Sequence, residues 1–330
     1  MTIEKVTTVD PVEEVNTLVS KALVALDEFK QIEDQEKIDA IVQAAAVAAL
    51  DQREPLAIAA VEETGRGVVE DKVIKNLFAS ENVANSLRGL KTVGIVDRDE
   101  SSGLTTIADP VGVVCAMVPT TNPTSTTIFK SLISLKTRNP IIFSFHPAAN
   151  ESSKQAFRIV RDAAIKAGAP KGCIQFIEQP SLDATNALMK HDGVSIILAT
   201  GGSAMVKAAY SCGKPALGVG PGNVPAYVHK DAKLKEAVID IVLSKSFDNG
   251  MICASEQAAI VDTEHYEEFI ELMKEHHVYF VNKEEKAKLE EFVFGAKAYS
   301  NNCAGAKLNA DVVGKPATWI AEQAGFKVPA

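Results

Sequence analysis

The chain has 330 residues, 46% of them hydrophobic, so it can bury a substantial core, and its length suggests two domains or one large domain with an appendage. A formal net charge of −9, without clustered Lys and Arg, argues against a nucleic-acid surface. The amino terminus lacks an apolar signal core, and no later apolar run reaches the roughly 18 residues that span a bilayer. The expected class is a cytoplasmic globular enzyme without nucleic-acid or membrane partners.

Cysteine and histidine usage predicts a reducing compartment and no metal. The 5 cysteines are odd in number and scattered, without Cys-x-x-Cys pairs. Three histidines fall in a glutamate-rich segment, which we expect to form a solvated helix because ligands must converge on a metal. These histidines are His265, His276 and His277. Residues 283–291 likewise predict an exposed helix with opposite charges at i and i+4.

The first part of the chain predicts helices. Apolar residues recur at helical spacing over residues 15–26 and again over 37–50, and a turn at Gly65 precedes a further helical stretch that ends near Asn76. The pattern changes near Gly103. There residues 104–108 alternate like a strand, and residues 111–118 read as a buried parallel strand.

From residue 118 the chain alternates between strand and helix. We predict helices over 125–137, 152–167 and 182–190, and strands over 140–145, 174–177 and 194–198. Such repetition predicts a mostly parallel, Rossmann-type α/β sheet with helices on both faces and ligand sites outside the carboxyl ends of the strands. A polar stretch at residues 228–233 and a following helix over 234–247 suggest a domain boundary, giving domains 1–230 and 231–330.

Two post-strand loops have the composition of ligand loops. Residues 119–124 follow the buried strand, and their hydroxyl, amide and backbone N–H groups suit a polar ligand, although prolines and hydroxyls also make ordinary turns. Residues 200–203 open a predicted helix over 204–210, which Ser203 is expected to cap. The glycines there would admit a pyrophosphate, but the spacing is not Gly-x-Gly-x-x-Gly, and small residues also suit a tight turn.

A third loop and one cysteine complete the pattern. Residues 218–225 hold three glycines and two prolines, so no regular element is expected there and backbone can pass close to a ligand. Cys253 follows a turn-prone Asp-Asn-Gly and precedes a strand-like run, which suggests a presented nucleophile. Taken alone, a cysteine among apolar neighbours is more often a small buried hydrophobe.

With these loops and Cys253 in order, the chain resembles the aldehyde dehydrogenase superfamily, and more closely its coenzyme A-acylating branch, the N-terminal half of bifunctional aldehyde-alcohol dehydrogenases. The motifs lie at residues 117–123, 199–202, 218–225 and 249–253, and the resemblance covers essentially all 330 residues. It implies that Cys253 is the nucleophile and that Asn122 stabilises the oxyanion. It also implies a set of residues that line the NAD site, namely Met117, Val118, Pro119, Thr120, Thr121, Asn122, Gly202 and Gly220.

The resemblance implies fermentative interconversion of acetyl-CoA plus NADH with acetaldehyde, NAD and CoA through an acyl-cysteine. Residues 1–230 would bind the dinucleotide and 231–330 would form part of the catalytic domain. Relatives continue beyond the corresponding point, so an incomplete catalytic domain is expected, with a homo-oligomer in the full-length relative. Metal plays no part in this chemistry.

Two departures bear on the assignment. Hydrolytic relatives carry a water-activating glutamate in the glycine-rich loop, whereas residues 218–222 hold no carboxylate, which favours acyl transfer to CoA. His146 stands where many relatives place a lysine for the adenosine ribose, and it either takes over that contact or caps the strand end. A hydrolytic aldehyde dehydrogenase and a non-catalytic piece that binds NAD or partner subunits remain the alternatives.

Overall fold

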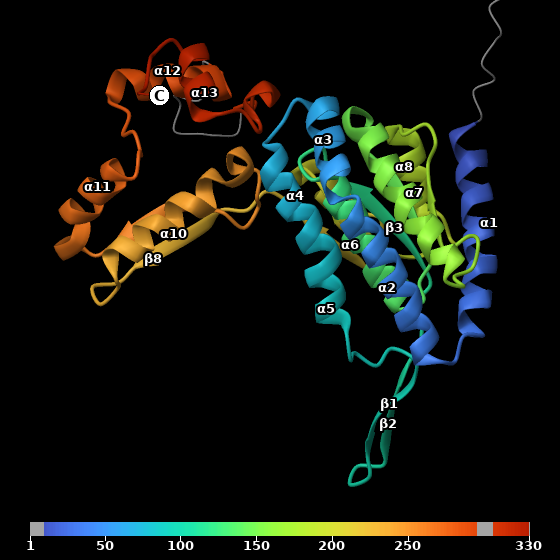
Figure 1. Cartoon of the computed structure of the whole chain (residues 1–330). Coiled ribbons are helices and arrows are strands. Elements are labelled where there is room, and N and C mark those ends of the chain that lie inside the picture. The colour runs from blue at the N-terminus through green and yellow to red at the C-terminus, as the bar shows by residue number, and fades with distance from the viewer. Residues whose placement is uncertain (1–9, 296–305, 330) are drawn as a thin grey trace, which may run out of the picture. The chain divides into compact units, whose positions relative to one another are not determined.

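The computed structural model describes residues 10–295 and 306–329, which fall into two compact units (Figure 1). The first unit comprises the residues up to Thr64 together with Lys72–Pro221. The second comprises Gly65–Asp71 and the residues from Gly222 onwards. The boundary expected after residue 230 lies later than this division, because the strand over residues 224–228 pairs within the second unit.

The first unit is built on a five-stranded parallel sheet in the order β5-β4-β3-β6-β7. Its strands are β3 (Val113–Val118), β4 (Ile141–Phe145), β5 (Ile174–Phe176), β6 (Val194–Thr200) and β7 (Ala216–Val219). The strand order reverses between β3 and β6, the place where doubly wound sheets bind ligands. The predicted Rossmann-type α/β sheet is thereby confirmed.

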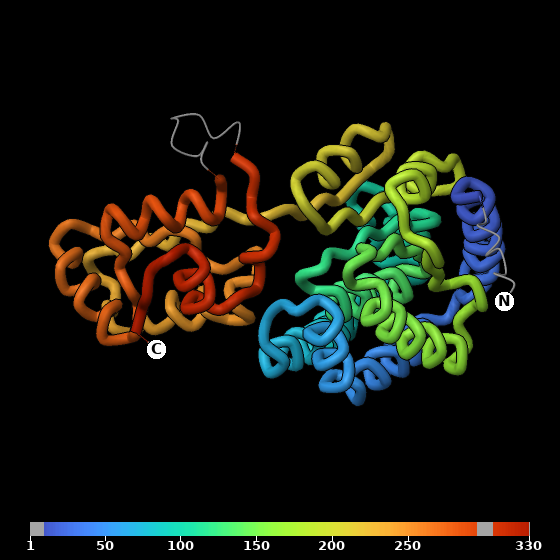
Figure 2. Tube along the Cα trace, turned by 90° about the horizontal axis from the view of Figure 1, so that it is seen from above, coloured from blue at the N-terminus to red at the C-terminus, as the bar shows by residue number. Residues whose placement is uncertain are grey.

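Helices cover both faces of this sheet, and its strand β3 is therefore buried on both sides. Val114, Ala116 and Val118 belong to one apolar cluster, whereas the alternate residues Val113, Cys115 and Met117 belong to the other. The helices are α1 (Pro11–Lys30), α2 (Gln35–Asp51), α3 (Arg53–Thr64), α4 (Val69–Leu77), α5 (Val83–Leu87), α6 (Pro123–Lys136), α7 (Asn150–Lys166), α8 (Leu182–Lys190) and α9 (Ser203–Tyr210). Figure 2 follows the chain as a tube, in which the helices appear as coils.

Shorter elements complete the first unit. A π-helical turn, η1 (Phe78–Asn82), joins α4 to α5, and a 3₁₀ turn, η2 (Pro147–Ala149), precedes α7. A hairpin pairs β1 (Gly94–Asp99) antiparallel to β2 (Leu104–Ala108) and projects from this unit (Figure 1). The strand predicted over residues 104–108 is therefore confirmed.

The second unit has a smaller core. Its strands β8 (Val224–Val228) and β9 (Glu256–Val261) pair in parallel. The core consists of Val228, Leu234, Val238 and Phe269. The other elements are α10 (Leu234–Ser246), η3 (Phe247–Gly250), η4 (Thr263–His265), α11 (Tyr266–Glu275), α12 (Lys283–Phe294), η7 (Ala310–Val312) and α13 (Ala317–Gln323). Of the helices in the described residues of both units, none combines the length and hydropathy needed to cross a membrane.

Two local predictions were wrong. Helix α9 begins at Ser203 itself and has Gly202 as its N-cap residue, with no side-chain cap, so Ser203 lies within the first turn. Regular strands also extend into the glycine-rich segment, since β7 ends at Val219 and β8 begins at Val224. Glycine and proline are tolerated there because β7 is an edge strand and β8 belongs to a two-stranded sheet.

Candidate functional site

The Asn122 loop, residues 119–122, leaves the carboxyl end of β3 and enters α6. All four of its residues are half-buried. Asn122 occupies the N-cap position of α6, and Pro123 follows at the first helical position, which its fixed φ favours. The Asn122 side chain makes no capping hydrogen bond, although asparagine is among the best N-cap residues. Its amide group is therefore held by other contacts.

Two lysines on α4 hold this loop. Lys75 Nζ donates to Asn122 Oδ1 at 2.7 Å, and Lys72 Nζ donates to the carbonyl oxygen of Thr121 at 2.9 Å. The Asn122 Nδ2 donates a longer hydrogen bond, 3.3 Å, to Thr121 Oγ1. Since an ammonium group can only donate, Lys75 fixes which end of the amide carries the oxygen.

A third lysine, Lys130, lies near the carboxyl ends of strands β3 and β6. Lys130 Nζ donates to the carbonyl oxygens of Met117 and Leu198, at 2.8 Å each, and so joins β3 to β6 where the strand order reverses. Burial lowers the pKa of Lys130 to about 7. Met117 and Val118, two of the predicted cofactor residues, are only 3% and 4% exposed. They belong to the core and pack beneath the carboxyl end of β3.

The loop after β6 forms an open cradle. Gly201 N donates to the carbonyl oxygen of Val219 at 3.1 Å, which ties the ends of β6 and β7 together. Among residues 10–295 and 306–329, a Cβ added at Gly202 would meet nothing within 4 Å, and one at Gly220 would meet its nearest atom at 3.8 Å. Packing within the chain therefore does not require glycine at either position. Gly202 is the N-cap residue of α9, and no side chain caps that helix N-terminus.

Gly218 differs from these two glycines. A Cβ there would lie 2.6 Å from Tyr210 Cε2 and 2.7 Å from Val206 Cγ1. Its small size is thus required by the packing of α9 on β7, which is a steric role. Gly218 and Gly220 of one sequence motif consequently differ in their surroundings, and only the structure separates them.

Cys253 lies in the second unit and is exposed to solvent. It ends the Cys253 turn, residues 247–253, in which Asp248 and Asn249 adopt left-handed φ angles of 51° and 52°. Such angles are uncommon outside glycine, although Asp and Asn tolerate them better than most residues. The turn directs the chain sharply from α10 into β9.

Carboxylates and a glycine secure this turn. Asp248 is fully buried and accepts a hydrogen bond from the backbone N–H of Val68 at 2.8 Å, while its own N–H donates to Asp71 Oδ2 at 2.7 Å. A Cβ at Gly67 would fall 2.0 Å from Asp248 Oδ1. The segment before α4 therefore passes so close to the turn that a side chain at position 67 would have to displace its neighbours.

The glycine-rich loop also reaches Cys253. A Cβ at Gly222 would lie 2.0 Å from the carbonyl oxygen of Cys253, so the backbone at Gly222 passes directly over the peptide group of Cys253. The structure thus brings Gly222 and Cys253 together within the second unit. Asn122, Gly202 and Gly220 belong to the first unit.

The other cysteines differ from Cys253 in exposure. Cys115 and Cys173 are buried, and burial raises the pKa of each thiol to about 12, so neither supplies thiolate near neutral pH. Cys212 is half-buried and donates to the carbonyl oxygen of Ala209. Cys303 lies outside the described residues.

His146 acts at the end of β4. Its Nδ1 accepts a hydrogen bond from the backbone N–H of Ala148 at 3.1 Å, so it caps η2, the 3₁₀ turn that follows the strand, and the expected contact with an adenosine ribose stays a prediction. Sequence reasoning missed the neighbouring Glu63, whose two carboxylate oxygens accept from the backbone N–H groups of Glu151 and Ser152 at 2.8 Å each. Glu63 therefore caps α7 from a distant part of the chain.

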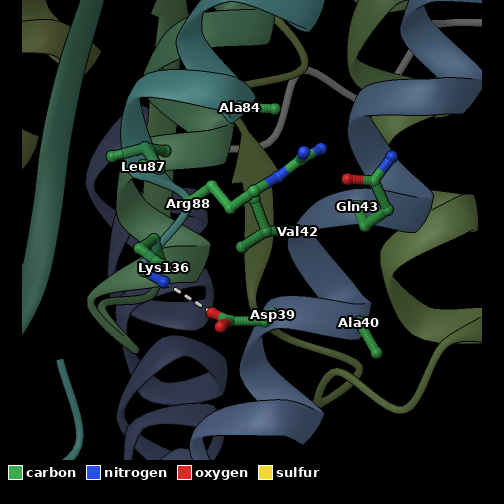
Figure 3. Close-up of a pocket in the computed structure, with 8 residues that line it drawn as sticks. All are labelled: Asp39, Ala40, Val42, Gln43, Ala84, Leu87, Arg88 and Lys136. Carbon is green, nitrogen blue, oxygen red and sulfur yellow. Dashed lines mark hydrogen bonds and ion pairs between the residues drawn. The ribbon is translucent and has the colours of Figure 1, made fainter. Parts of the chain in front are cut away.

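Figure 3 shows a pocket elsewhere in the first unit, lined by residues of α2, α5 and α6 together with Arg88. Its volume is about 280 Å³, and an ion pair between Lys136 and Asp39 lies at its wall. None of the predicted site residues lines it. The pocket is therefore separate from the loops described above.

Comparisons with known proteins agree with the motifs. The aldehyde dehydrogenase family model matches residues 2–296. The aldehyde-alcohol dehydrogenase of Streptococcus pneumoniae serotype 4 is 68% identical over 96% of this chain, which spans about 36% of that relative's length. An acetylating aldehyde dehydrogenase from Geobacillus thermoglucosidasius has a TM-score of 0.90 at 49% identity, covering 97% of this chain and 69% of its own.

One further structure carries a ligand. The propionaldehyde dehydrogenase of Rhodopseudomonas palustris, with bound CoA and an acylated cysteine, has a TM-score of 0.82 at 32% identity. The alignment covers 96% of this chain and 70% of that one. The resemblance drawn from the motifs and the fold that it implied are both confirmed, and the chain belongs to the aldehyde dehydrogenase family.

Proposed function

We propose that this chain carries CoA-acylating aldehyde dehydrogenase activity, converting acetyl-CoA, NADH and a proton into acetaldehyde, CoA and NAD, and the reverse. The observation that supports it most is an exposed cysteine on a fixed turn, beneath a glycine-rich loop that has no carboxylate. Its relatives include enzymes that acylate CoA. The chain spans only part of its curated relatives, so this activity is proposed from its own residues.

The first step is thioester exchange at Cys253. The Sγ thiolate adds to the acyl-CoA carbonyl carbon, a new carbon–sulfur bond forms, and the CoA thiolate leaves and takes up a proton. One thioester replaces another, so little bond energy is lost. We assign the Asn122 Nδ2 group as a donor to the transient oxyanion, a role in which one donor commonly contributes about 3 kcal/mol.

The nicotinamide cofactor, when bound, supplies or accepts the hydride. The chain's own part is to hold it. We propose that Gly202 and Gly220 let its pyrophosphate reach the uncapped N-terminus of α9, with the Asn122 loop lining the nicotinamide side. The carbonyls of Met117 and Leu198 are fixed by Lys130, which keeps the strand ends below this site in place.

We further propose NAD rather than NADP as the cofactor. In doubly wound sheets the ribose 2′ position is read at the end of the strand next to the first one, which here is β4. The helix that follows β4 would attract a 2′-phosphate, but its N-terminal N–H groups are already bound by the Glu63 carboxylate. A second negative group there would be repelled.

Water is a poor competitor for the acyl-cysteine in this proposal. The segment 218–222 has no carboxylate that would activate a water molecule, so the acyl group persists until a thiol arrives. Ala254 and Ser255 beside the nucleophile are small and suit a short acyl group. We place the chain in the cytoplasm, and exposed Leu104 and Ile107 on the β1–β2 hairpin support self-association into a homo-oligomer.

The test is NADH oxidation in the presence of acetyl-CoA, with free thiol measured in parallel. The proposal predicts one CoA thiol released for each NADH consumed. Aldehyde oxidation that proceeds without CoA and yields free acid would replace it with a hydrolytic activity. Tight NADH binding without turnover would favour the non-catalytic alternative.

A further inference from the structure

We infer that Lys75 is a positioning residue that orients the side-chain amide of Asn122 for oxyanion stabilisation. The inference rests on the proposed function, because it concerns the same reaction. It begins from a side chain that stands at a helix N-cap position and does not cap the helix. Asparagine at this position usually accepts a capping hydrogen bond from the helix backbone. Asn122 does not, so its side-chain amide is used for another contact.

The contact that holds it is with Lys75. The Nζ–Oδ1 distance of 2.7 Å is that of a charge-assisted hydrogen bond. The oxygen and nitrogen of an amide have nearly the same shape, so packing alone selects poorly between the two orientations. The lysine selects strongly, because the flipped amide would place its N–H donors against an ammonium group.

The orientation has a chemical consequence. With Oδ1 bound to Lys75, the Nδ2 group faces away from the lysine. Within the described part of the chain only one of its two N–H bonds is engaged, in a long contact to Thr121 Oγ1. The second N–H is left for an oxyanion. The nearby positive charge also withdraws electrons from the amide, which makes Nδ2–H a better donor to developing negative charge.

The surrounding contacts keep α4 and the Asn122 loop in register. Lys72, one helical turn before Lys75, is buried and binds the Thr121 carbonyl. Asn76 Oδ1 accepts a hydrogen bond from Thr124 Oγ1 at 2.8 Å, which fixes the first turn of α6 to the same helix. Lys75 therefore meets Asn122 from a helix that is independently anchored, so its replacement need not displace the loop.

The first test is a double-mutant cycle in acetyl-CoA reduction. We expect Lys75→Met to lower kcat on the order of 10-fold to 10²-fold while changing KM for acetyl-CoA little, because a transition-state contact is lost. Adding Lys75→Met to Asn122→Ala should cost almost nothing more, since the lysine acts through the amide. Lys75→Arg, which keeps the donor and the charge, should restore most of kcat.

The control is Lys37→Met, which removes one exposed positive charge from α2 without touching the loop. It should behave as the unsubstituted chain. Equal losses from Lys75→Met in the presence and absence of the Asn122 side chain would overturn the inference, because the two residues would then act independently.

A second measurement does not depend on activity. The side-chain amide signals of Asn122, identified by their absence in Asn122→Ala, should shift and exchange faster with water in Lys75→Met and stay in place in Lys37→Met. Unchanged signals in Lys75→Met would refute the positioning role even in an active protein. Shifted signals in a chain that lacks CoA-dependent turnover would uphold the role and count against the proposed function alone.

Discussion

The two loops that carry the predicted catalytic residues are held in different ways. The Asn122 loop leaves a fully buried strand, and lysine side chains from α4 bind its carbonyl and amide oxygens. The Cys253 turn lies in a unit with a small core and depends on left-handed backbone angles, a buried carboxylate and close glycine contacts. The first loop is fixed by side chains from a helix, and the second by its own backbone angles, by hydrogen bonds to carboxylates and by close backbone contacts.

This difference has a consequence for substitution. A loop fixed by side chains loses one hydrogen bond at a time, so single changes should reduce catalysis while leaving the fold intact. A turn fixed by close backbone approach has no spare room, so adding even one methyl group should move it. The predictions below separate the two cases, from the largest effect to the smallest.

The largest effect should come from Asn122→Ala, which removes the proposed oxyanion donor without disturbing the backbone. We expect kcat to fall on the order of 10²-fold to 10³-fold with thermal stability nearly unchanged. Asn16→Ala, on the exposed side of α1, is the matched control. An Asn122→Ala variant that keeps its turnover to within about 3-fold would remove Asn122 from the mechanism.

Gly67→Ala tests the backbone-fixed turn. The new Cβ would lie 2.0 Å from Asp248 Oδ1 at a φ of 82°, so the turn must shift. We expect acylation of Cys253 to slow on the order of 10-fold to 10²-fold, because small misplacements of a reacting group are costly. The rate of CoA release on mixing with acetyl-CoA in the absence of NADH would measure this.

Gly89→Ala is the control for backbone strain. Its φ of 79° is similar, but no atom of the residues that the structure describes lies within 4 Å of the added atom. Equal acylation rates in the two variants would show that strain, and not contact with Asp248, explains the effect. A rate near that of the unsubstituted chain in Gly67→Ala alone would contradict the account of the turn.

Lys130 predicts a pH dependence in the first unit. Burial lowers its pKa to about 7 from the ordinary 10.5, so between these values the unfolded chain binds a proton that the folded one does not. The free energy of unfolding should therefore rise with pH through this window, by up to about 1.4 kcal/mol per pH unit, and this contribution should be flat below pH about 7.

Urea denaturation of the unsubstituted chain and of Lys130→Met across this window would measure the effect. The variant should show the smaller slope, because it has no proton to bind at this position. Parallel slopes would mean that Lys130 stays charged when folded, held by its two carbonyl partners.

The smallest effect concerns α12, far in sequence from either loop. Asn282 caps this helix in a reciprocal capping box with Glu285. Asn282→Ala should destabilise the helix locally by about 1 kcal/mol, detected as faster hydrogen exchange of its amides, while turnover stays the same. A loss of activity would show that α12 supports the Cys253 turn.

Much of the fold could be predicted because the first unit alternates regularly. The buried strand at residues 113–118 and the helices on either side follow from local apolar patterns, and predicted elements there agree with the structure. The failures lie where local patterns compete with packing. Ser203 looked like a cap, yet Gly202 takes that position, and Gly218 proved to be a strand residue.

The supports of the candidate site could not be predicted. Lys75 and Asn122 are 47 positions apart, and Val68 and Asp248 are 180 apart. No local periodicity relates such residues, and Lys75 and Asp248 look like ordinary surface charges in the sequence. Only the folded backbone shows that one of them orients an amide and that the other is fully buried.

The central claim, that Cys253 is an acyl-accepting nucleophile, is tested most directly by trapping the acyl-enzyme. The chain would be mixed with acetyl-CoA without NADH, and its peptides would be weighed by mass spectrometry while free CoA is measured. The account predicts one acetyl group on Cys253, one CoA released per chain, and neither in Cys253→Ala. An unmodified Cys253, or acetylation that persists elsewhere in Cys253→Ala with the same CoA release, would contradict it.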